Sequence, residues 1–420
     1  MSARKKNWFR RFFSILGPGL ITGAADDDPS GIATYSITGA KLGTGMLWTA
    51  LLTWPLMAAV QMMCARIGMV TGMGLTHSLR KKFPLPIIFI CSLALFLANT
   101  INIGADLLGM AEAAKLLTGI KEGFLVLFFG LVILVVSIRC DFKQIAAILK
   151  WLCLTLFAYV IVAFIIHPDW SSIARDTFIP SLPQGRAAIE TLVAILGTTI
   201  SPYLFVWQAS SEVEEEKAAG LNLPESRKGA TQVEINTRAL DVGIGTFFSN
   251  LVMYFIILST GLTLHRHGIT NIETAGQAAE ALRPLAGKFA AVLYSLGIIG
   301  VGFLAIPTLA GSAAYAFAET FGWSQGLAAK PKNAQRFYFV FGLSMVAGMT
   351  LYFLKVNPMK ALYWSAIFNG ILAPFLLVGV VIVASDAAIM NHQPSSWAAR
   401  IWVAATAVLM FAAGIGMFLF

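Results

Sequence analysis

Charge is scarce in this chain of 420 residues. Only 12% of its residues are charged, whereas 57% are hydrophobic. A soluble domain carries about 25% charged residues, so the composition excludes an ordinary soluble protein and favours a protein with many membrane helices. The net charge of +9 fits basic loops between such helices and does not indicate a nucleic-acid partner.

Cysteine, histidine and phosphate-binding motifs are sparse or absent. The four cysteines form no Cys-x-x-Cys pair, and the five histidines lie at the ends of apolar segments or in loops. The sequence contains no Gly-x-x-x-x-Gly-Lys-Ser/Thr loop, which a chain hydrolysing ATP by itself would need. We therefore expect neither an enzyme nor a pump, and we infer no catalytic residue, no cofactor and no obligatory protein partner.

Long apolar segments make up most of the chain. Because a spanning helix needs about 20 apolar residues, the sequence predicts an all-α polytopic membrane protein with about eleven transmembrane helices. These form a single transmembrane domain over residues 1–420. The expected spans are 13–40, 46–70, 86–111, 122–139, 145–167, 187–216, 239–263, 287–317, 335–354, 361–385 and 398–419.

Basic residues orient these spans in the lipid bilayer. If the N-terminus lies in the cytoplasm, the inside loops hold more lysine and arginine than the outside loops. We therefore expect an integral protein of the plasma (inner) membrane, with a cytoplasmic N-terminus and the C-terminus outside.

Two spans are interrupted in corresponding places. Residues 26–31 of the first span read Asp-Asp-Asp-Pro-Ser-Gly, and residues 197–203 of the sixth read Gly-Thr-Thr-Ile-Ser-Pro-Tyr. A charge at the bilayer centre costs about 2.5–3.5 kcal/mol, so three carboxylates there indicate a functional site. Five spans separate the two segments, and an odd number of spans per repeat inverts the second repeat. Paired interruptions of this kind are typical of a transporter's binding site at the membrane midplane.

The prolines identify candidate ligands in the backbone. Each proline frees the carbonyl four residues before it, which here belongs to Ala25 and to Thr198. Successive helical residues point about 100° apart, so the three aspartates cannot all face one point unless the helix unwinds. We expect Asp28 to bind an ion directly, with Asp27 as a further ligand and Asp26 lining the cavity.

These residues resemble a known family. Gly17-Pro18-Gly19, then eight residues, then Asp28-Pro29, resembles the first helix of the NRAMP divalent-metal transporters, where the pattern is Asp-Pro-Gly-Asn. Residues 197–203 are similar to the family's sixth helix, which carries Met-Pro-His. The resemblance covers nearly the whole chain. It implies a LeuT-type 5+5 inverted repeat with broken helices 1 and 6, and transport by alternating access. Repeat one would cover about 13–167, repeat two about 187–385, and an extra helix about 398–419.

The resemblance also implies roles for single residues. Asp28 matches the family's metal-binding aspartate, Gly31 stands where the family has an asparagine ligand, and Ser201 replaces the methionine. Thr198 falls where a backbone carbonyl contributes. The expected metal-binding residues are thus Asp28, Ser201, Thr198, Ala25, Asp27 and Gly31.

Further residues match positions that handle protons in the family. Tyr203 and Gln208 replace its two helix-six histidines, and Asp106 falls near its acidic pair on helix three, of which one member remains. The expected cavity or coupling residues are Asp26, Tyr203, Gln208 and Asp106. With both histidines gone, we expect weak or absent proton coupling.

The lost ligands indicate the kind of ion. A thioether suits transition metals, whereas carboxylate, hydroxyl and carbonyl oxygens suit Mg²⁺, Ca²⁺ and Mn²⁺. Without the asparagine, the site has room for water, and Mg²⁺ usually keeps several waters. We therefore expect a secondary transporter of divalent metal cations, Mg²⁺ or Mn²⁺ rather than Fe²⁺, in a divergent relative that lacks the Met and Asn ligands.

Other functions remain open at this point. Half-helix N-termini at Ser30 and Tyr203 would attract anions, so the same scaffold could carry a small anion such as bicarbonate, or an organic solute, coupled to a cation or a proton. A channel or a receptor is a third class, which paired broken helices favour less. The glutamates at 212 and 214–216 are expected to form a solvated helix end, with an acidic funnel as the alternative.

Overall fold

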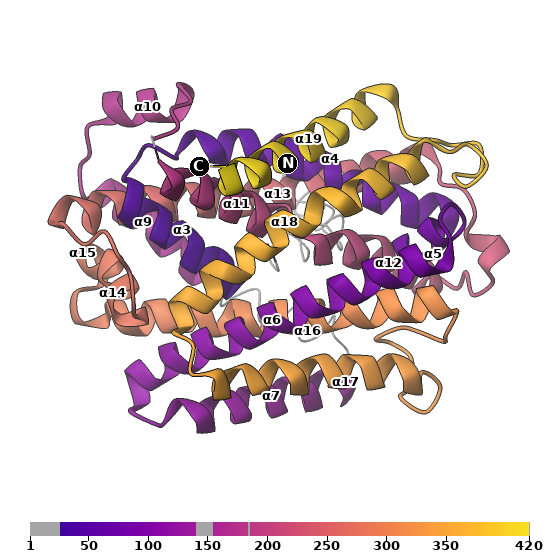
Figure 1. The fold of residues 1–420 in the computed structure, drawn as a ribbon, viewed down its shortest axis with the longest axis horizontal. Coiled ribbons are helices and arrows are strands. Elements are labelled where there is room, and N and C mark those ends of the chain that lie inside the picture. Colours follow the sequence, from indigo (N-terminus) through magenta and orange to yellow (C-terminus); the bar gives the residue numbers. More distant parts are fainter. Residues whose placement is uncertain (1–25, 140–153, 184, 420) are drawn as a thin grey trace, which may run out of the picture.

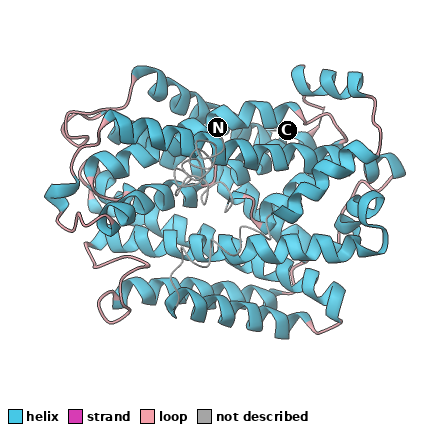
Figure 2. Ribbon diagram, turned by 180° about the vertical axis from the view of Figure 1, so that it is seen from behind, coloured by secondary structure: helices cyan, strands magenta, loops and turns pink. Residues whose placement is uncertain are grey.

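The computed structural model describes residues 26–139, 154–183 and 185–419. Most long helices run along one direction, and loops gather at their two ends (Figures 1 and 2). The helices are α3 (Pro29–Leu42), α4 (Trp48–Thr71), α5 (Leu75–Arg80), α6 (Leu85–Thr118), α7 (Glu122–Arg139), α9 (Phe157–Ile165), α10 (Trp170–Phe178), α11 (Arg186–Thr199), α12 (Pro202–Ala218), α13 (Gln232–Thr263), α14 (Ala275–Ala279), α15 (Arg283–Ala286), α16 (Ala290–Phe321), α17 (Gln335–Met349), α18 (Pro358–Ser385) and α19 (Trp397–Leu419).

The described helices fit the predicted spans. Nine helical segments in the described part of the chain are long and apolar enough to cross a membrane, one of them formed by α11 and α12 together. The prediction of an all-α membrane protein is therefore confirmed. The two other expected spans, 13–40 and 145–167, extend into residues outside those described, and α3 and α9 are the parts that the structure shows.

Several helices are longer than their hydropathy predicts. α13 begins at Gln232, seven residues before the expected start of its span, because Thr231 and Glu234 form a capping box there. α6 continues through Glu112 and Lys115 to Thr118, and Gly119 caps it with a positive φ of 71° that stops the helix. Hydropathy marks the part of a helix that meets lipid, whereas backbone hydrogen bonds continue until a cap ends them.

Two layers of helices place the interrupted segments inside the molecule. α6 and α16 lie side by side, and α7 and α17 cover one side of this pair (Figure 1). Asn99 on α6 donates to the carbonyl of Leu309 on α16 at 2.9 Å. On the other side, α3, α11, α13 and α18 pack against one another. The interrupted segments therefore face neighbouring helices rather than lipid.

The second predicted interruption is present, and at the first the structure describes the helix that follows it, since the residues before Asp26 lie outside those described. α3 begins at Pro29 with Asp28 as its N-cap. In the sixth span α11 ends at Thr199 and α12 begins at Pro202, which leaves Ile200 and Ser201 outside the helix. Proline suits the first position of a helix because it has no amide hydrogen to satisfy there.

A glycine contact joins α11 to α18 beside the second interruption. A Cβ atom on Gly197 would lie 2.0 Å from the carbonyl oxygen of Ala366 and 2.3 Å from the amide nitrogen of Gly370. On the opposite helix, a Cβ on Gly370 would lie 2.4 Å from the carbonyl oxygen of Val193. Small residues let membrane helices approach closely, and this contact fixes the position of α11 just before it breaks.

We predict that Gly197→Ala lowers the thermal stability of the purified protein, because the added methyl group meets backbone atoms that cannot move aside. Overpacking of this kind costs about 1–3 kcal/mol. The matched control is Gly243→Ala on α13, where an added Cβ would meet nothing within 4 Å. Melting temperatures in detergent test the prediction, and equal melting temperatures for the two variants would contradict it.

Candidate functional site

Asp28 is held by two amides at the start of α3. One carboxylate oxygen, Oδ1, accepts the backbone amide of Gly31 at 2.6 Å, and the other, Oδ2, accepts Nδ2 of Asn102 at 2.9 Å. The side chain is buried. The local sequence explains the first bond, because an aspartate at an N-cap accepts from the amide three residues later.

Asn102 links Asp28 to a second carboxylate. Its Nδ2 also lies 3.5 Å from Oδ2 of Asp106, one turn further along α6. Residues four apart share one face of a helix, so Asn102 and Asp106 face Asp28 together. Asn102 and Asp106 are both 0% exposed. Sequence inspection selected Asp106 but missed Asn102, for which the signal was the four-residue spacing of two polar residues in an apolar helix.

No basic side chain compensates the carboxylates of Asp28 and Asp106 among the described residues. Within the described ranges no lysine, arginine or histidine forms an ion pair with Asp28 or Asp106. Buried carboxylates without a partner charge are costly, so the arrangement favours binding of a cation.

The other two aspartates face a different helix. The Ser249 hydroxyl on α13 lies 2.8 Å from Oδ2 of Asp26 and 3.1 Å from Oδ1 of Asp27. Asp26 and Asp27 thus meet α13, whereas Asp28 meets α6. The triple aspartate is divided between two sides, as expected from the angle between successive residues. Sequence reasoning also missed Ser249.

Ser201 satisfies the backbone at the second interruption. Its hydroxyl donates to the carbonyl oxygens of Gly197 at 2.7 Å and Thr198 at 2.8 Å. Pro202 has no amide hydrogen for the Thr198 carbonyl, and Ser201 supplies the missing donor. The expected ligand carbonyl therefore already accepts one hydrogen bond, although a carbonyl oxygen has a second lone pair.

Thr198 connects the two interruptions. A Cβ atom on Gly31 would lie 3.0 Å from Oγ1 of Thr198 and 3.4 Å from Oδ1 of Asp28. The side chains of Thr198 and Asp28 thus both lie close to the position that a side chain of residue 31 would occupy. Ser201 instead lines a small cavity on the α4 side together with Gln61. Both polar side-chain atoms of Gln61 are buried and have no hydrogen-bond partner among the described residues.

Tyr203 and Gln208 lie further along α12. Tyr203 is buried, and its carbonyl accepts the Ser312 hydroxyl at 2.8 Å. Gln208 lies in the second turn of α12, and its Nε2 donates to Oε1 of Glu212 at 2.7 Å.

The expectation of a solvated glutamate end is wrong for Glu212. It is buried and forms an ion pair with Arg238 of α13, 2.7 Å apart. Arg238 also pairs with Glu215 and Asp241, each at 2.6 Å. The run of glutamates on α12 does not indicate that an arginine of α13 packs against it. The sequence alone could therefore not predict these ion pairs.

The structure brings some of the expected residues together and not others. Asp28 lies between Asp106, reached through Asn102 at its Oδ2, and the pair Gly31 and Thr198 near its Oδ1. Asp26, Asp27, Ser201 and Gln208 make other contacts. Ala25 lies outside the described residues. In residues 26–139, 154–183 and 185–419, no three His, Cys, Asp or Glu side chains gather closely enough to hold a metal ion. A metal site built from these residues would need further donors, such as amide, hydroxyl, carbonyl or water oxygens.

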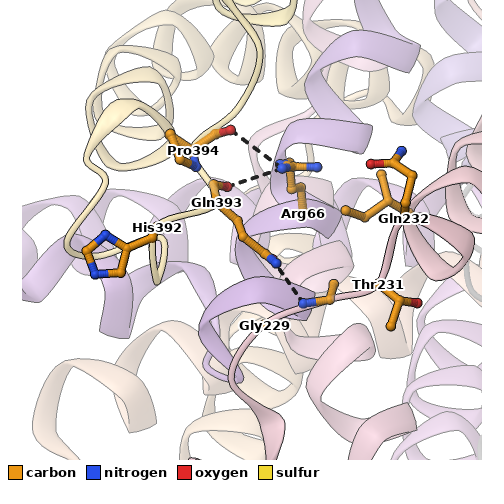
Figure 3. Close-up of a pocket in the computed structure, with 9 residues that line it drawn as sticks. Arg66, Gly229, Thr231, Gln232, His392, Gln393 and Pro394 are labelled. Atoms are coloured by element: carbon orange, nitrogen blue, oxygen red, sulfur yellow. Dashed lines mark hydrogen bonds between the residues drawn. The ribbon is translucent and has the colours of Figure 1, made fainter.

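A cavity of about 650 Å³ lies elsewhere, between α4 and the loops before α13 and after α18 (Figure 3). Arg66 lines it and donates to the carbonyl oxygens of Gln393 and Pro394 at 3.2 and 3.5 Å. The amide of Ala230 donates to the side chain of Gln393 at 3.0 Å. A cavity lined by an arginine does not suit a cation, so the candidate site is at the interrupted helices.

Comparison with known proteins links this arrangement to transporters. The family model described as natural resistance-associated macrophage protein-like matches residues 19–419. The divalent metal cation transporter MntH of Mesorhizobium japonicum is 26% identical over 415 residues, which cover 96% of this chain and 88% of that protein.

Solved structures share the fold. The manganese transporter of Eremococcus coleocola aligns with a TM-score of 0.73 at 17% identity, covering 98% of this chain and 89% of that one. Mhp1, a nucleobase-cation-symport-1 family transporter, aligns with a TM-score of 0.58 at 14% identity over 96% of this chain and 90% of its own. The predicted LeuT-type fold is thereby confirmed.

We predict that Gly31→Ala destabilises the protein through Thr198. The new Cβ would lie 3.0 Å from Oγ1 of Thr198, closer than ordinary contact. The second substitution Thr198→Ala removes that oxygen, so the double variant should recover most of the lost stability. A double-mutant cycle of melting temperatures measures this coupling, which we expect to be about 0.5–3 kcal/mol. Additive effects of the two substitutions would show that the side chains do not meet.

Proposed function

The chain belongs to the natural resistance-associated macrophage protein-like family, and on that premise we propose that it is a secondary transporter of divalent metal cations. The observation that carries the proposal is the uncompensated carboxylate of Asp28, placed at a helix interruption and joined by Asn102 to Asp106. Two carboxylates carry the charge that balances one dication, and the buried surroundings strengthen that attraction.

The donor types support a hard ion. Side chains around Asp28 offer carboxylate, amide and hydroxyl oxygens, and Ser201 provides no sulfur where the resembling family has methionine. Oxygen donors suit Mg²⁺ and Mn²⁺ better than they suit softer metals. Because few protein ligands surround Asp28, the transported ion would keep several of its waters, a habit of Mg²⁺. We propose Mg²⁺ or Mn²⁺ as the substrate.

The two interruptions support transport by alternating access. Half-helices that meet inside the membrane can tilt independently on either side of a bound ion. All five histidines lie in loops or short helical segments, so none can exchange protons beside Asp28. We propose weak or absent proton coupling, with an inside-negative membrane potential contributing about 2.3 kcal/mol per charge per 100 mV.

The proposed location is the plasma membrane, with the N-terminus in the cytoplasm and the C-terminus outside. The lysines and arginines of the loops support this orientation. The partners in this proposal are the lipid bilayer and the divalent ion, with protons left open as a second ion.

Uptake into liposomes tests the function. Purified protein is reconstituted and offered Mg²⁺, Mn²⁺ and Fe²⁺ separately, with and without a pH gradient, while internal metal and internal pH are recorded. We expect uptake of Mg²⁺ or Mn²⁺ that responds to membrane potential and does not acidify the lumen. Strict preference for Fe²⁺ with proton entry would contradict the hard-ion proposal. Uptake of bicarbonate or an organic solute, with no metal uptake, would favour an anion or solute carrier.

We predict that Asp28→Asn abolishes metal uptake in this assay, because the amide keeps the size of the side chain but removes its charge. A matched control is Asp386→Asn, since Asp386 follows α18 in a loop and pairs with Lys82 there. The control should transport like the unmodified protein. Undiminished metal uptake by folded Asp28→Asn would show that the ion binds elsewhere.

A further inference from the structure

The side-chain amide of Asn102 lies between two carboxylates, a position that would suit a cation. Its Nδ2 lies 2.9 Å from Oδ2 of Asp28 and 3.5 Å from Oδ2 of Asp106, so one amide group contacts two carboxylates from two helices. We propose that the transported dication binds at this point. In the loaded state Asn102 turns its amide, so that Oδ1 and the two carboxylates together face the ion. This inference rests on the proposed function and names three of the ligands.

The orientation of the amide in the empty site follows from charge. An asparagine has one end that donates and one that accepts. With Nδ2 toward the carboxylates, both contacts are attractive. With Oδ1 there, three oxygens would converge, which is unfavourable unless a cation lies between them. The side-chain torsion that exchanges the two ends is soft, so the same residue can serve both states.

The unused end of the amide supports this exchange. Oδ1 of Asn102 is buried and has no hydrogen-bond partner among the described residues. A buried polar atom without a partner is costly and calls for an explanation. In the proposed loaded state that oxygen binds the ion, and the cost is removed.

The spacing fits a small dication. Magnesium holds oxygen ligands at about 2.1 Å in an octahedron, so neighbouring ligands lie about 3.0 Å apart. The amide end of Asn102 is 2.9 Å from Asp28, which matches this separation. Its distance of 3.5 Å to Asp106 needs only a small approach, and the larger Mn²⁺ needs less.

Gly31 cannot supply a ligand at this place. A Cβ on Gly31 would lie 3.0 Å from Oγ1 of Thr198, so a side chain at the position where the resembling family has asparagine would have to displace the Thr198 hydroxyl. Asn102 approaches Asp28 from α6 instead. An amide is thus present beside the aspartate, but it comes from a different helix.

Metal affinity of the purified full-length protein tests the inference. Isothermal titration calorimetry with Mg²⁺ and Mn²⁺ compares Asn102→Ala with Asn99→Ala. Asn99 is the matched control because it is also buried on α6 and donates to the Leu309 carbonyl, away from the carboxylates. We expect Asn102→Ala to weaken binding by about 10–100-fold. Asn99→Ala should lower the melting temperature but leave the affinity unchanged.

A second experiment exchanges the residues at positions 102 and 106, so that the test does not depend on a single variant that could fail to fold. Asp106→Asn removes one carboxylate and should weaken binding by about 10–100-fold. Adding Asn102→Asp restores two carboxylates and one amide in the same group, so the double variant should regain most of the affinity. A double variant that binds as poorly as Asp106→Asn would overturn the shared site.

The outcomes separate this inference from the function on which it rests. If the folded unmodified protein binds and transports no divalent ion, the proposed function fails. If it binds the ions and Asp28→Asn abolishes binding, but Asn102→Ala retains full affinity, only the role of Asn102 fails. The ion would then bind Asp28 on its other side, toward Thr198.

Discussion

The carboxylate of Asp28, fixed at the beginning of a helix inside the membrane, is the constraint from which the rest of the site follows. A buried charge is tolerated only when hydrogen bonds and opposite charge compensate for lost water. Here the Gly31 amide and the Asn102 amide each contact one of its oxygens. Neutral amides stabilise the negative charge without cancelling it, so the carboxylate stays available to a cation. An arginine or lysine would have neutralised it permanently.

The two interrupted helices contribute unequally to this arrangement. Both restart at a proline, but Asp28 accepts from the helix that follows it, whereas Ser201 donates to the carbonyls of the helix before it. The first interruption therefore presents a charge, and the second has its exposed backbone satisfied from within. The second also places Thr198 against Gly31, and the glycine contact between α11 and α18 fixes that approach. The two segments thus have similar backbone courses, and their different side chains, an aspartate and a serine, give them different roles.

Much of the fold could be predicted from the sequence because the membrane imposes simple rules. Apolar length marks the spans, and Pro29 and Pro202 mark the interruptions, since proline cannot continue a helix without losing an amide. The site was harder. The Asp-Asp-Asp motif does not show which helix each aspartate faces, because that depends on how α6 and α13 pack around it. Asn102 and Ser249 looked like ordinary polar residues, and Glu212 was misjudged because its partner Arg238 comes from another helix.

The residue type at position 102 bears on how a carrier can release what it binds. Transport requires that the empty and loaded states differ little in free energy, since a deep minimum for either would stop the cycle. A lysine beside Asp28 and Asp106 would stabilise the empty state and compete with the ion. A third carboxylate would add repulsion when the site is empty and hold the ion too tightly when it is full. An asparagine avoids both extremes, because its two ends provide a donor for one state and an acceptor for the other. That balance favours an amide at the point where Asp28 and Asp106 converge.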